Sequence, residues 1–306
     1  MNSTTSLSGH EALLHVSGPD ALKFLQGQTT CDIRNVGPSQ AARGVYCTPQ
    51  GRVICDFLLV ELGQDHCALR LRREIREPTV AVLAKYSVFS KVMLEGERED
   101  WLVAGVCGAN AADTLGQLFG SVPRADLECI RGENFVLVQT GAAGDTFECF
   151  MAAESTWPAA LENAFDSLSA ECWRHREISA GSARIEAATL GEFVPQVLNY
   201  DLTGHISFNK GCYTGQEVVA RLHYRGRSKR RSFAFQLPAG AEAKAGDAVF
   251  DRAGKQVGSV INSACCDGDS RLLAATGLDD VEADLRLGTA DGAEFTMLDM
   301  PYLVEA

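Results

Sequence analysis

The segment Lys210-Gly-Cys-Tyr-Thr-Gly-Gln-Glu217 lies directly before an amphipathic stretch at residues 218–224. Thr214 followed three residues later by Glu217 matches a capping box, in which both side chains bond free amides at the start of a helix. We therefore expect a helix to begin at Thr214 and to end near Gly226, because glycine is common just past a helix terminus.

Cys212 lies two residues before this expected helix start. The positive end of the helix dipole and the nearby Lys210 both favour a thiolate there, which would make Cys212 a reactive or redox-sensitive cysteine. The alternative is a small buried residue in a tight glycine-rich turn, the usual environment of a free cysteine. Cys212 is one of eleven cysteines, and local chemistry leaves both interpretations open.

The composition is that of a globular protein with a substantial core. The chain has 306 residues, of which 46% are hydrophobic and 22% charged, enough for two or three modules. Residues 1–15 lack the basic start and apolar run of a signal peptide. The longest apolar stretch, residues 53–62, is interrupted by Asp56 and Glu61 and is too short to span a bilayer. We therefore expect a soluble, cytoplasmic protein with no membrane partner.

The cysteines also favour the cytoplasm. None of them forms a Cys-x-x-Cys pair, so the sequence predicts no zinc site and no tightly bound metal. The adjacent Cys265 and Cys266 are expected on a strand, where neighbouring side chains point to opposite faces. The odd number and irregular spacing indicate unpaired thiols, which are typical of a reducing compartment.

One segment is strongly basic although the chain is acidic. The net charge of −12 argues against a general nucleic-acid binder. Residues 221–231 nevertheless contain His223, no acid and six cations: Arg221, Arg225, Arg227, Lys229, Arg230 and Arg231. This run is either a focused anion-binding site or a solvated basic loop.

The order of apolar runs and turns predicts an α+β fold. A strand–turn–helix pattern and a hairpin around Pro49-Gln50-Gly51 open the chain, and a second α+β pattern follows, ending in a helix at residues 157–168. From residue 229 the pattern changes to short alternating runs separated by glycines, which is typical of a small antiparallel barrel. We expect two α+β units in residues 1–228 and a C-terminal β-barrel in residues 229–306.

The motif at residues 210–217, with Ala220-Arg221 after it, resembles the signature of the YgfZ family. These are folate-binding proteins related to the glycine-cleavage T protein (GcvT). Residues 181–196, which include Phe193-Val-Pro-Gln196, also fit that family, and residues 16–32 and 46–56 resemble the N-terminal signature of the superfamily. The likeness spans most of the chain and weakens in the middle and in the C-terminal part.

This resemblance implies a GcvT/YgfZ-like three-domain arrangement around a central opening. One of the two α+β units would interrupt the other, and the β-barrel would follow. The resemblance also implies a site that binds tetrahydrofolate or a derivative, and a role in iron–sulfur cluster assembly or repair and in tRNA modification. Cys212 would be the functional residue of the motif, whose other positions are Lys210, Gly211, Tyr213, Gly215, Gln216 and Glu217.

Family likeness also indicates residues for folate itself. Trp173 aligns with a tryptophan that contacts the pterin, and would otherwise be a core residue. Glu186 matches a pterin-binding glutamate of T proteins, and would otherwise be a surface acid paired with Arg184. Cations hold the glutamate tail of folate, and the same cations would suit RNA phosphates. The candidates are Arg225, Arg227 and Lys229.

One departure from the T proteins decides between activities. Residues 64–70 read Gln64-Asp-His-Cys-Ala-Leu-Arg70, without the Asn-containing pattern around the aspartate that promotes aminomethyl transfer. The departure therefore favours an accessory protein over a glycine-cleavage transferase, with folate, iron–sulfur proteins or their assembly factors, and tRNA as partners. The alternatives are a folate-dependent one-carbon transferase and an RNA-binding module that uses the basic segment.

Overall fold

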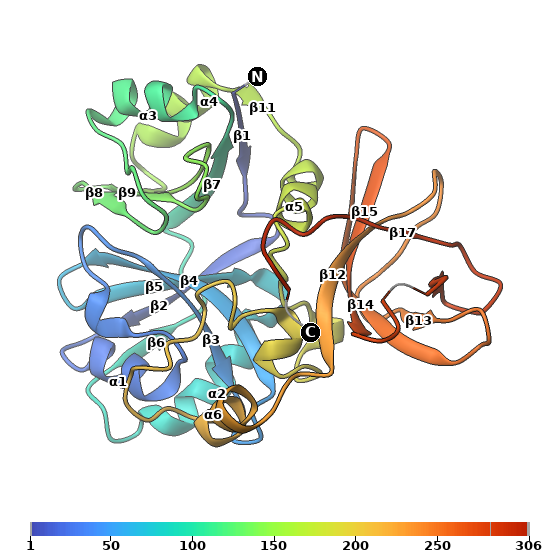
Figure 1. The fold of residues 1–306 in the computed structure, drawn as a ribbon. Coiled ribbons are helices and arrows are strands. Elements are labelled where there is room, and N and C mark those ends of the chain that lie inside the picture. The colour runs from blue at the N-terminus through green and yellow to red at the C-terminus, as the bar shows by residue number, and fades with distance from the viewer. Residues whose placement is uncertain (1, 282, 305–306) are drawn as a thin grey trace. The chain divides into compact units, whose positions relative to one another are not determined.

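The computed structural model describes residues 2–281 and 283–304, which divide into two compact units (Figure 1). The first unit comprises the chain up to residue 45, residues 55–170 and residues 209–213. The second comprises residues 46–54, 171–208 and the chain from residue 214. Within the described residues, no helix is long and apolar enough to cross a bilayer.

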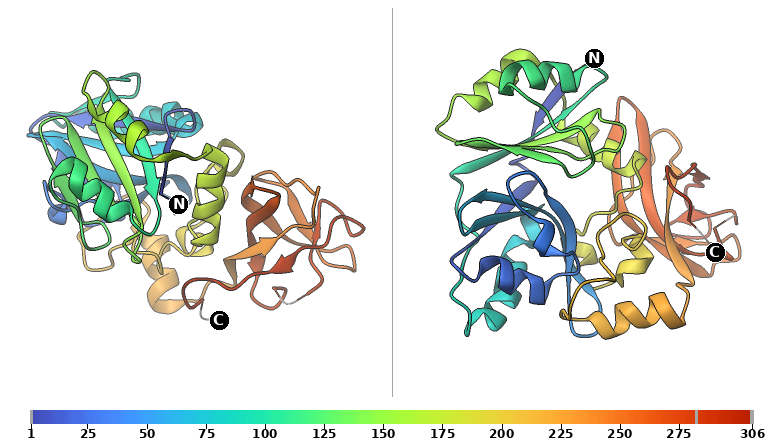
Figure 2. Two further views of the ribbon diagram at one scale, coloured as in Figure 1. Left: turned by 90° about the horizontal axis from the view of Figure 1, so that it is seen from above. Right: turned by 60° about the vertical axis from the view of Figure 1, so that its left-hand side comes forward.

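The first unit contains a six-stranded sheet of order β11-β1-β7-β10-β9-β8. Its strands are β1 (Ser3–Ser6), β7 (Trp101–Cys107), β8 (Cys129–Arg131), β9 (Phe135–Gln139), β10 (Thr146–Ala152) and β11 (Asp166–Ser167). Helices α3 (Ala111–Phe119) and α4 (Trp157–Ala164) cover one face (Figure 2), where Leu115 and Leu161 pack against the strand residues Leu137 and Phe147. The helix expected at residues 157–168 is too long, because Asp166 and Ser167 pair with β1.

The same unit contributes a five-stranded sheet of order β3-β4-β5-β2-β6. Its elements are β2 (Glu11–Ser17), β3 (Ala42–Cys47), β4 (Val53–Gly63), β5 (His66–Arg72) and β6 (Met93–Glu95), with α1 (Ala21–Gln28) and α2 (Arg76–Ser87). The predicted hairpin is confirmed, since Gly51 closes the β3–β4 turn with a φ of 72° and its amide bonds the Thr48 carbonyl.

A buried ion network joins the two sheets of this unit. Arg70 on β5 donates to both carboxylate oxygens of Glu148 on β10, at 2.8 and 2.6 Å, and to Glu11 on β2 at 3.4 Å. All three residues are buried. Charged groups are rarely buried unless paired, because isolated burial costs several kcal/mol per ion. The network therefore constrains how the sheets pack.

The second unit contains the C-terminal antiparallel sheet, of order β16-β13-β14-β15-β12-β17. Its strands are β12 (Arg230–Gln236), β13 (Ala248–Phe250), β14 (Gln256–Cys266), β15 (Asp269–Gly277), β16 (Arg286–Leu287) and β17 (Thr296–Met297). The predicted alternation is confirmed, because Phe233 and Phe235 are buried in its core. Irregularities at residues 249–250 and 260–262 interrupt the ladder, and such bulges bend strands. The expected barrel is thus a curled, open sheet whose edge strands are β16 and β17.

Helix α5 (Ala170–Ser179) is attached to this sheet by covalent and polar links. A disulfide joins Cys172 to Cys266, and His175 bonds Asp269 at 3.1 Å. The expectation that all cysteines are unpaired is therefore wrong for these two, while Cys265 and Cys266 do lie on a strand as expected. The remaining helical elements are α6 (Gln216–Arg225), η1 (Ile33–Asn35), η2 (Arg73–Ile75), η3 (Ala187–Thr189) and η4 (Pro195–Leu198).

Candidate functional site around Cys212 and helix α6

Lys210 anchors the beginning of the motif to the loop that follows α1. Its Nζ donates to the carbonyl oxygens of Gln26, Thr29 and Cys31, at 2.8, 2.5 and 2.7 Å. An ammonium has three N–H donors, so these carbonyls use all of them. Lys210 is buried, and burial lowers its pKa to about 8, which leaves it protonated at neutral pH. The three Lys210 donors therefore serve the backbone and not the Cys212 sulfur, and the expected effect of its charge on the Cys212 thiol stays a prediction.

Cys212 lies between this anchor and a second buried residue. Tyr213 is buried, with its ring centroid 5.3 Å from the Lys210 Nζ, a geometry that favours cation–π attraction. Gly211 and Cys212 are both exposed. The alternative of a buried cysteine in a tight turn is therefore wrong. The thiol is accessible on a backbone fixed at both neighbouring sides.

The motif then enters α6 through a glycine rather than through a threonine cap. The helix begins at Gln216, with Gly215 as N-cap at a φ of 84°, so the capping box expected at Thr214 does not set the start. A Cβ at Gly215 would lie 2.5 Å from the Thr48 carbonyl oxygen in the β3–β4 turn. Only glycine fits this left-handed conformation and this close approach. The predicted end at Gly226 is confirmed, since Gly226 is the C-cap.

We predict that Gly215→Ala destabilises the protein more than Gly204→Ala. Gly204 also has a positive φ, of 77°, but a Cβ there meets nothing within 4 Å. In both variants, alanine in a left-handed backbone conformation costs about 1–2 kcal/mol. Gly215→Ala adds a clash between the new Cβ and the Thr48 carbonyl oxygen. The unfolding midpoints in urea, measured side by side, test this. Equal midpoints for the two variants would contradict the close approach at Gly215.

Helix α6 is held by η4 and exposes its basic residues. The Gln196 side-chain amide donates to the Val219 carbonyl at 2.8 Å, and Val219 is fully buried. Arg231 pairs with Asp201 at 2.6 Å, and Arg230 donates to the Ala275 carbonyl, so both serve the fold of the second unit. The remaining cations of the segment are exposed: Arg221, Arg225, Arg227 and Lys229. The basic run is thus two structural arginines plus an exposed cationic group.

An aromatic cluster next to these cations was not predicted from the sequence. Phe208 and His223 stack with ring centroids 3.6 Å apart and an interplanar angle of 11°. Tyr224 meets both rings edge-on and is 67% exposed. The only local signal was the adjacent His223-Tyr224 pair on the polar side of the expected helix.

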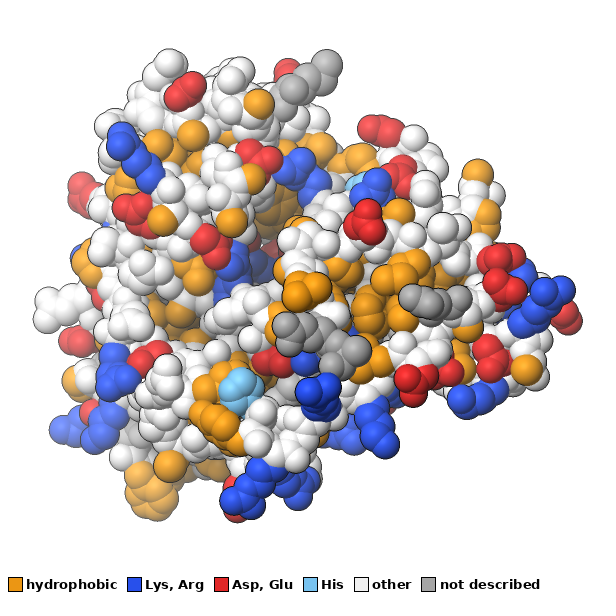
Figure 3. Space-filling view, in the orientation of Figure 1, with side chains coloured by type: hydrophobic (Ala, Val, Ile, Leu, Met, Phe, Trp, Pro, Cys, Tyr) orange, Lys and Arg blue, Asp and Glu red, His pale blue; other side chains and the backbone are white. Residues whose placement is uncertain are grey.

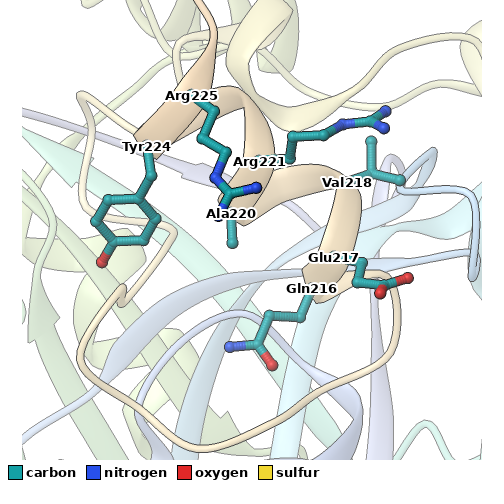
Figure 4. A pocket seen from close by; sticks show the side chains of 7 residues that line it. All are labelled: Gln216, Glu217, Val218, Ala220, Arg221, Tyr224 and Arg225. Carbon is teal, nitrogen blue, oxygen red and sulfur yellow. The ribbon is translucent and has the colours of Figure 1, made fainter.

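An open pocket of about 500 Å³ runs along the same helix (Figure 4). The side chains that line it all come from α6: Gln216, Glu217, Val218, Ala220, Arg221, Tyr224 and Arg225. Two predicted motif residues, Gln216 and Glu217, therefore border the pocket together with Arg225, which was predicted for folate or RNA. Cys212 does not line it.

Both residues expected to contact pterin neighbour Arg174, Trp173 in sequence and Glu186 by an ion pair. Trp173 and Arg174 are consecutive on α5, and Arg174 donates to Glu186 Oε1 at 2.8 Å, as does the Asn262 amide. Trp173 is only 4% exposed. The alternative pair of Glu186 with Arg184 is wrong, because Arg184 pairs with Glu177 at 2.6 Å. Arg174 and Glu186 thus form an ion pair, and Trp173, the residue before Arg174, is buried.

Comparison with known proteins adds a decisive similarity. Over 96% of its length the chain is 32% identical to the tRNA-modifying protein YgfZ of Enterobacter sp. (strain 638), 91% of which is covered. This chain belongs to the YgfZ family. It is also 31% identical to the tRNA-modifying protein YgfZ of Shigella dysenteriae serotype 1 (strain Sd197), with the same coverage of both chains. The family resemblance read from the motif is therefore confirmed.

The fold is shared with the wider superfamily. The GCVT N-terminal domain family matches residues 8–143. The crystal structure of the glycine cleavage system aminomethyltransferase T from Bartonella henselae superposes with a TM-score of 0.78 at 14% identity, covering 99% of this chain and 86% of that one. At this identity the likeness concerns the fold alone. The predicted GcvT/YgfZ-like α+β fold is confirmed.

Proposed function

We propose that this chain is a cytoplasmic, tetrahydrofolate-binding accessory protein that supports tRNA modification and the assembly or repair of iron–sulfur clusters, with Cys212 as its working thiol. The observation that carries the proposal is the exposure of Cys212 inside the family motif. Among the described residues nine cysteines are free, and only Cys212 and Cys265 are exposed. The relatives named as tRNA-modifying proteins support the tRNA part.

The surroundings of Cys212 suit a thiol that must meet another molecule at a defined place. Lys210, two residues before Cys212, donates hydrogen bonds to three carbonyls. Gly215, three residues after Cys212, lies so close to the β3–β4 turn that only glycine fits there. A functional group is positioned well when the residues around it are held by packing and hydrogen bonds. Cys212 is accessible, yet its backbone is held close on both sides.

Trp173 and Glu186 have side chains of the kind that a pterin needs. Folate rings need an apolar wall and an acceptor for their donor edge, which an indole and a carboxylate supply. Trp173 would provide the wall and Glu186 the acceptor, with Arg174 orienting the carboxylate. Arg225, Arg227 and Lys229 would contact the glutamate tail. Bound tetrahydrofolate would supply a carrier for one-carbon units.

Binding of tetrahydrofolate to the full chain tests the ligand and the site together. We expect the wild type to bind, and Trp173→Phe to bind about 3- to 10-fold more weakly, because a good aromatic contact contributes about 0.5–1.5 kcal/mol. Trp157→Phe is the matched control, since Trp157 stacks on Phe119 in the first unit. Isothermal calorimetry measures all three proteins. No binding by the wild type, or equal weakening in both variants, would contradict the folate proposal.

A further inference from the structure

The exposed face of α6 has two adjacent columns of different chemistry. Residues four apart lie on one side of a helix, so Gln216, Ala220 and Tyr224 form one column. By the same spacing, Glu217, Arg221 and Arg225 form the other. All six line the pocket of Figure 4. The small Ala220 side chain separates Tyr224 from Gln216 along the column (Figure 4).

The Tyr224 ring is a platform that is already in place. Its ring centroid lies 4.7 Å from that of His223 at an interplanar angle of 79°, and 6.2 Å from that of Phe208 at 75°. In this perpendicular geometry the edges of the stacked His223–Phe208 pair meet one face of the phenol and orient it, while Tyr224 remains 67% exposed. A ring that is ordered before binding loses less conformational entropy when a ligand stacks on it.

The second column supplies positive charge. Within the described part of the chain, Arg221 and Arg225 have no ion pair, whereas Arg231 of the same basic run pairs with Asp201. Glu217 is the acid of the column and lies in the first helical turn, where it complements the helix dipole. Figure 3 shows Lys and Arg side chains gathered with a histidine and hydrophobic side chains in the region where Figure 1 labels α6.

We propose that this face of α6 binds an unpaired stretch of RNA, with a base stacked on Tyr224 and the flanking phosphates on Arg221 and Arg225. Exposed aromatic rings between cations recognise single strands, because a base in a duplex cannot be stacked on a side chain without first being unstacked. The Gln216 amide can donate to and accept from a base edge. The inference rests on the tRNA part of the proposed function and names the surface that carries it.

The local pattern explains how an acidic protein can bind RNA. A net charge of −12 prevents general adhesion to nucleic acid. A few phosphate contacts alone would therefore contribute little affinity. Stacking of a base on Tyr224 adds affinity that does not depend on salt. A folate glutamate tail would need the cations of α6 but not the Tyr224 ring. The two ligands therefore make different demands on Tyr224.

The test is fluorescence anisotropy with the full chain and three labelled probes: an unmodified tRNA transcript, a short single-stranded RNA and the blunt duplex of the same sequence. We expect the transcript and the single strand to bind more tightly than the duplex. Tyr224→Ala should weaken single-strand binding by about 5- to 100-fold, the usual effect of losing one stacked base, and should leave the salt dependence unchanged. Tyr86→Ala, at a 43% exposed tyrosine of α2, is the matched control.

The arginine column has a different expected signature. Arg221→Gln with Arg225→Gln should lower the slope of log affinity against log salt by about 1.4, because each single-strand phosphate contact contributes about 0.7. Arg252→Gln with Lys255→Gln removes the same charge from exposed side chains elsewhere and should not change the slope. Circular dichroism checks that α6 is retained in each variant.

Equal effects of Tyr224→Ala and Tyr86→Ala, or a duplex bound as tightly as the single strand, would overturn the inference. The proposed function fails by different results, namely no tetrahydrofolate binding or no role of Cys212 in cells. Loss of RNA affinity only in the arginine variants would also overturn the stacking role of Tyr224.

Discussion

Lys210→Met is expected to lower the free energy of unfolding by about 3–5 kcal/mol, among the largest effects of any single substitution in this chain. Methionine keeps the length of the side chain but provides no donor. The carbonyls of Gln26, Thr29 and Cys31 would each lose a charge-assisted hydrogen bond in a buried place. An unsatisfied buried acceptor costs about 1–3 kcal/mol. Three of them therefore destabilise the fold by more than the apolar contacts of the new methionine stabilise it.

Urea unfolding of wild type and variant, followed by tryptophan fluorescence, measures this effect. Lys23→Met is the matched control, because Lys23 is an exposed lysine of α1. We expect the midpoint of Lys23→Met to remain close to that of the wild type. Lys210→Arg should not restore stability, since a planar guanidinium cannot direct three donors at converging carbonyls as an ammonium does. A wild-type midpoint in Lys210→Met would contradict the anchoring role.

Features with a short-range signal were predicted well from the sequence. The Pro49-Gln50-Gly51 turn and the alternation of Phe233 and Phe235 in β12 are both local patterns, and the structure confirms each. The family motif was equally local. It indicated Cys212 and its neighbours, because eight consecutive specified residues are a far stronger signal than composition.

Features that depend on distant partners were missed. The carbonyls that bind Lys210 precede it by 179 to 184 residues, so its burial has no local signature. The partners in the Cys172–Cys266 disulfide are 94 residues apart. Helix α6 begins later than its capping pattern predicted, with Gly215 as N-cap, and the Thr48 carbonyl that restricts this position to glycine comes from another part of the chain. Strand β11 exists only by pairing with β1.

The same limit applies to the folate residues. Sequence likeness indicated Trp173 and Glu186, and the structure pairs Glu186 with Arg174, which likeness had not indicated. The alternative interpretation, a surface acid, had paired Glu186 with Arg184, only two residues away. Salt bridges in the second unit depend on how α5 meets the C-terminal sheet, and sequence proximity does not determine this. The role of Trp173 and Glu186 in folate binding stays a prediction until binding is measured.

Cys212→Ser is expected to abolish the supporting function in cells while leaving the fold intact. The thiol is exposed, and exposed substitutions of similar size usually change stability by less than about 0.5 kcal/mol. Serine is a poor substitute because a hydroxyl does not form the thiolate on which nucleophilic and metal-binding chemistry depend. The loss should therefore appear in function and not in the unfolding midpoint or in folate affinity.

Cys265→Ser is the matched control for this prediction. Cys265 is the other exposed free cysteine and lies on β14, away from the family motif. Its replacement should leave cellular function at the wild-type level. If both variants failed equally, thiol oxidation or general instability would explain the loss, and the role given to Cys212 would be wrong.

The most direct measurement uses cells that lack the endogenous gene and carry wild type, Cys212→Ser or Cys265→Ser at equal protein levels. The activities of iron–sulfur enzymes and the modified-nucleoside content of tRNA are measured in each strain. The account predicts that wild type and Cys265→Ser restore both quantities and that Cys212→Ser restores neither. Full restoration of both quantities by Cys212→Ser would contradict it.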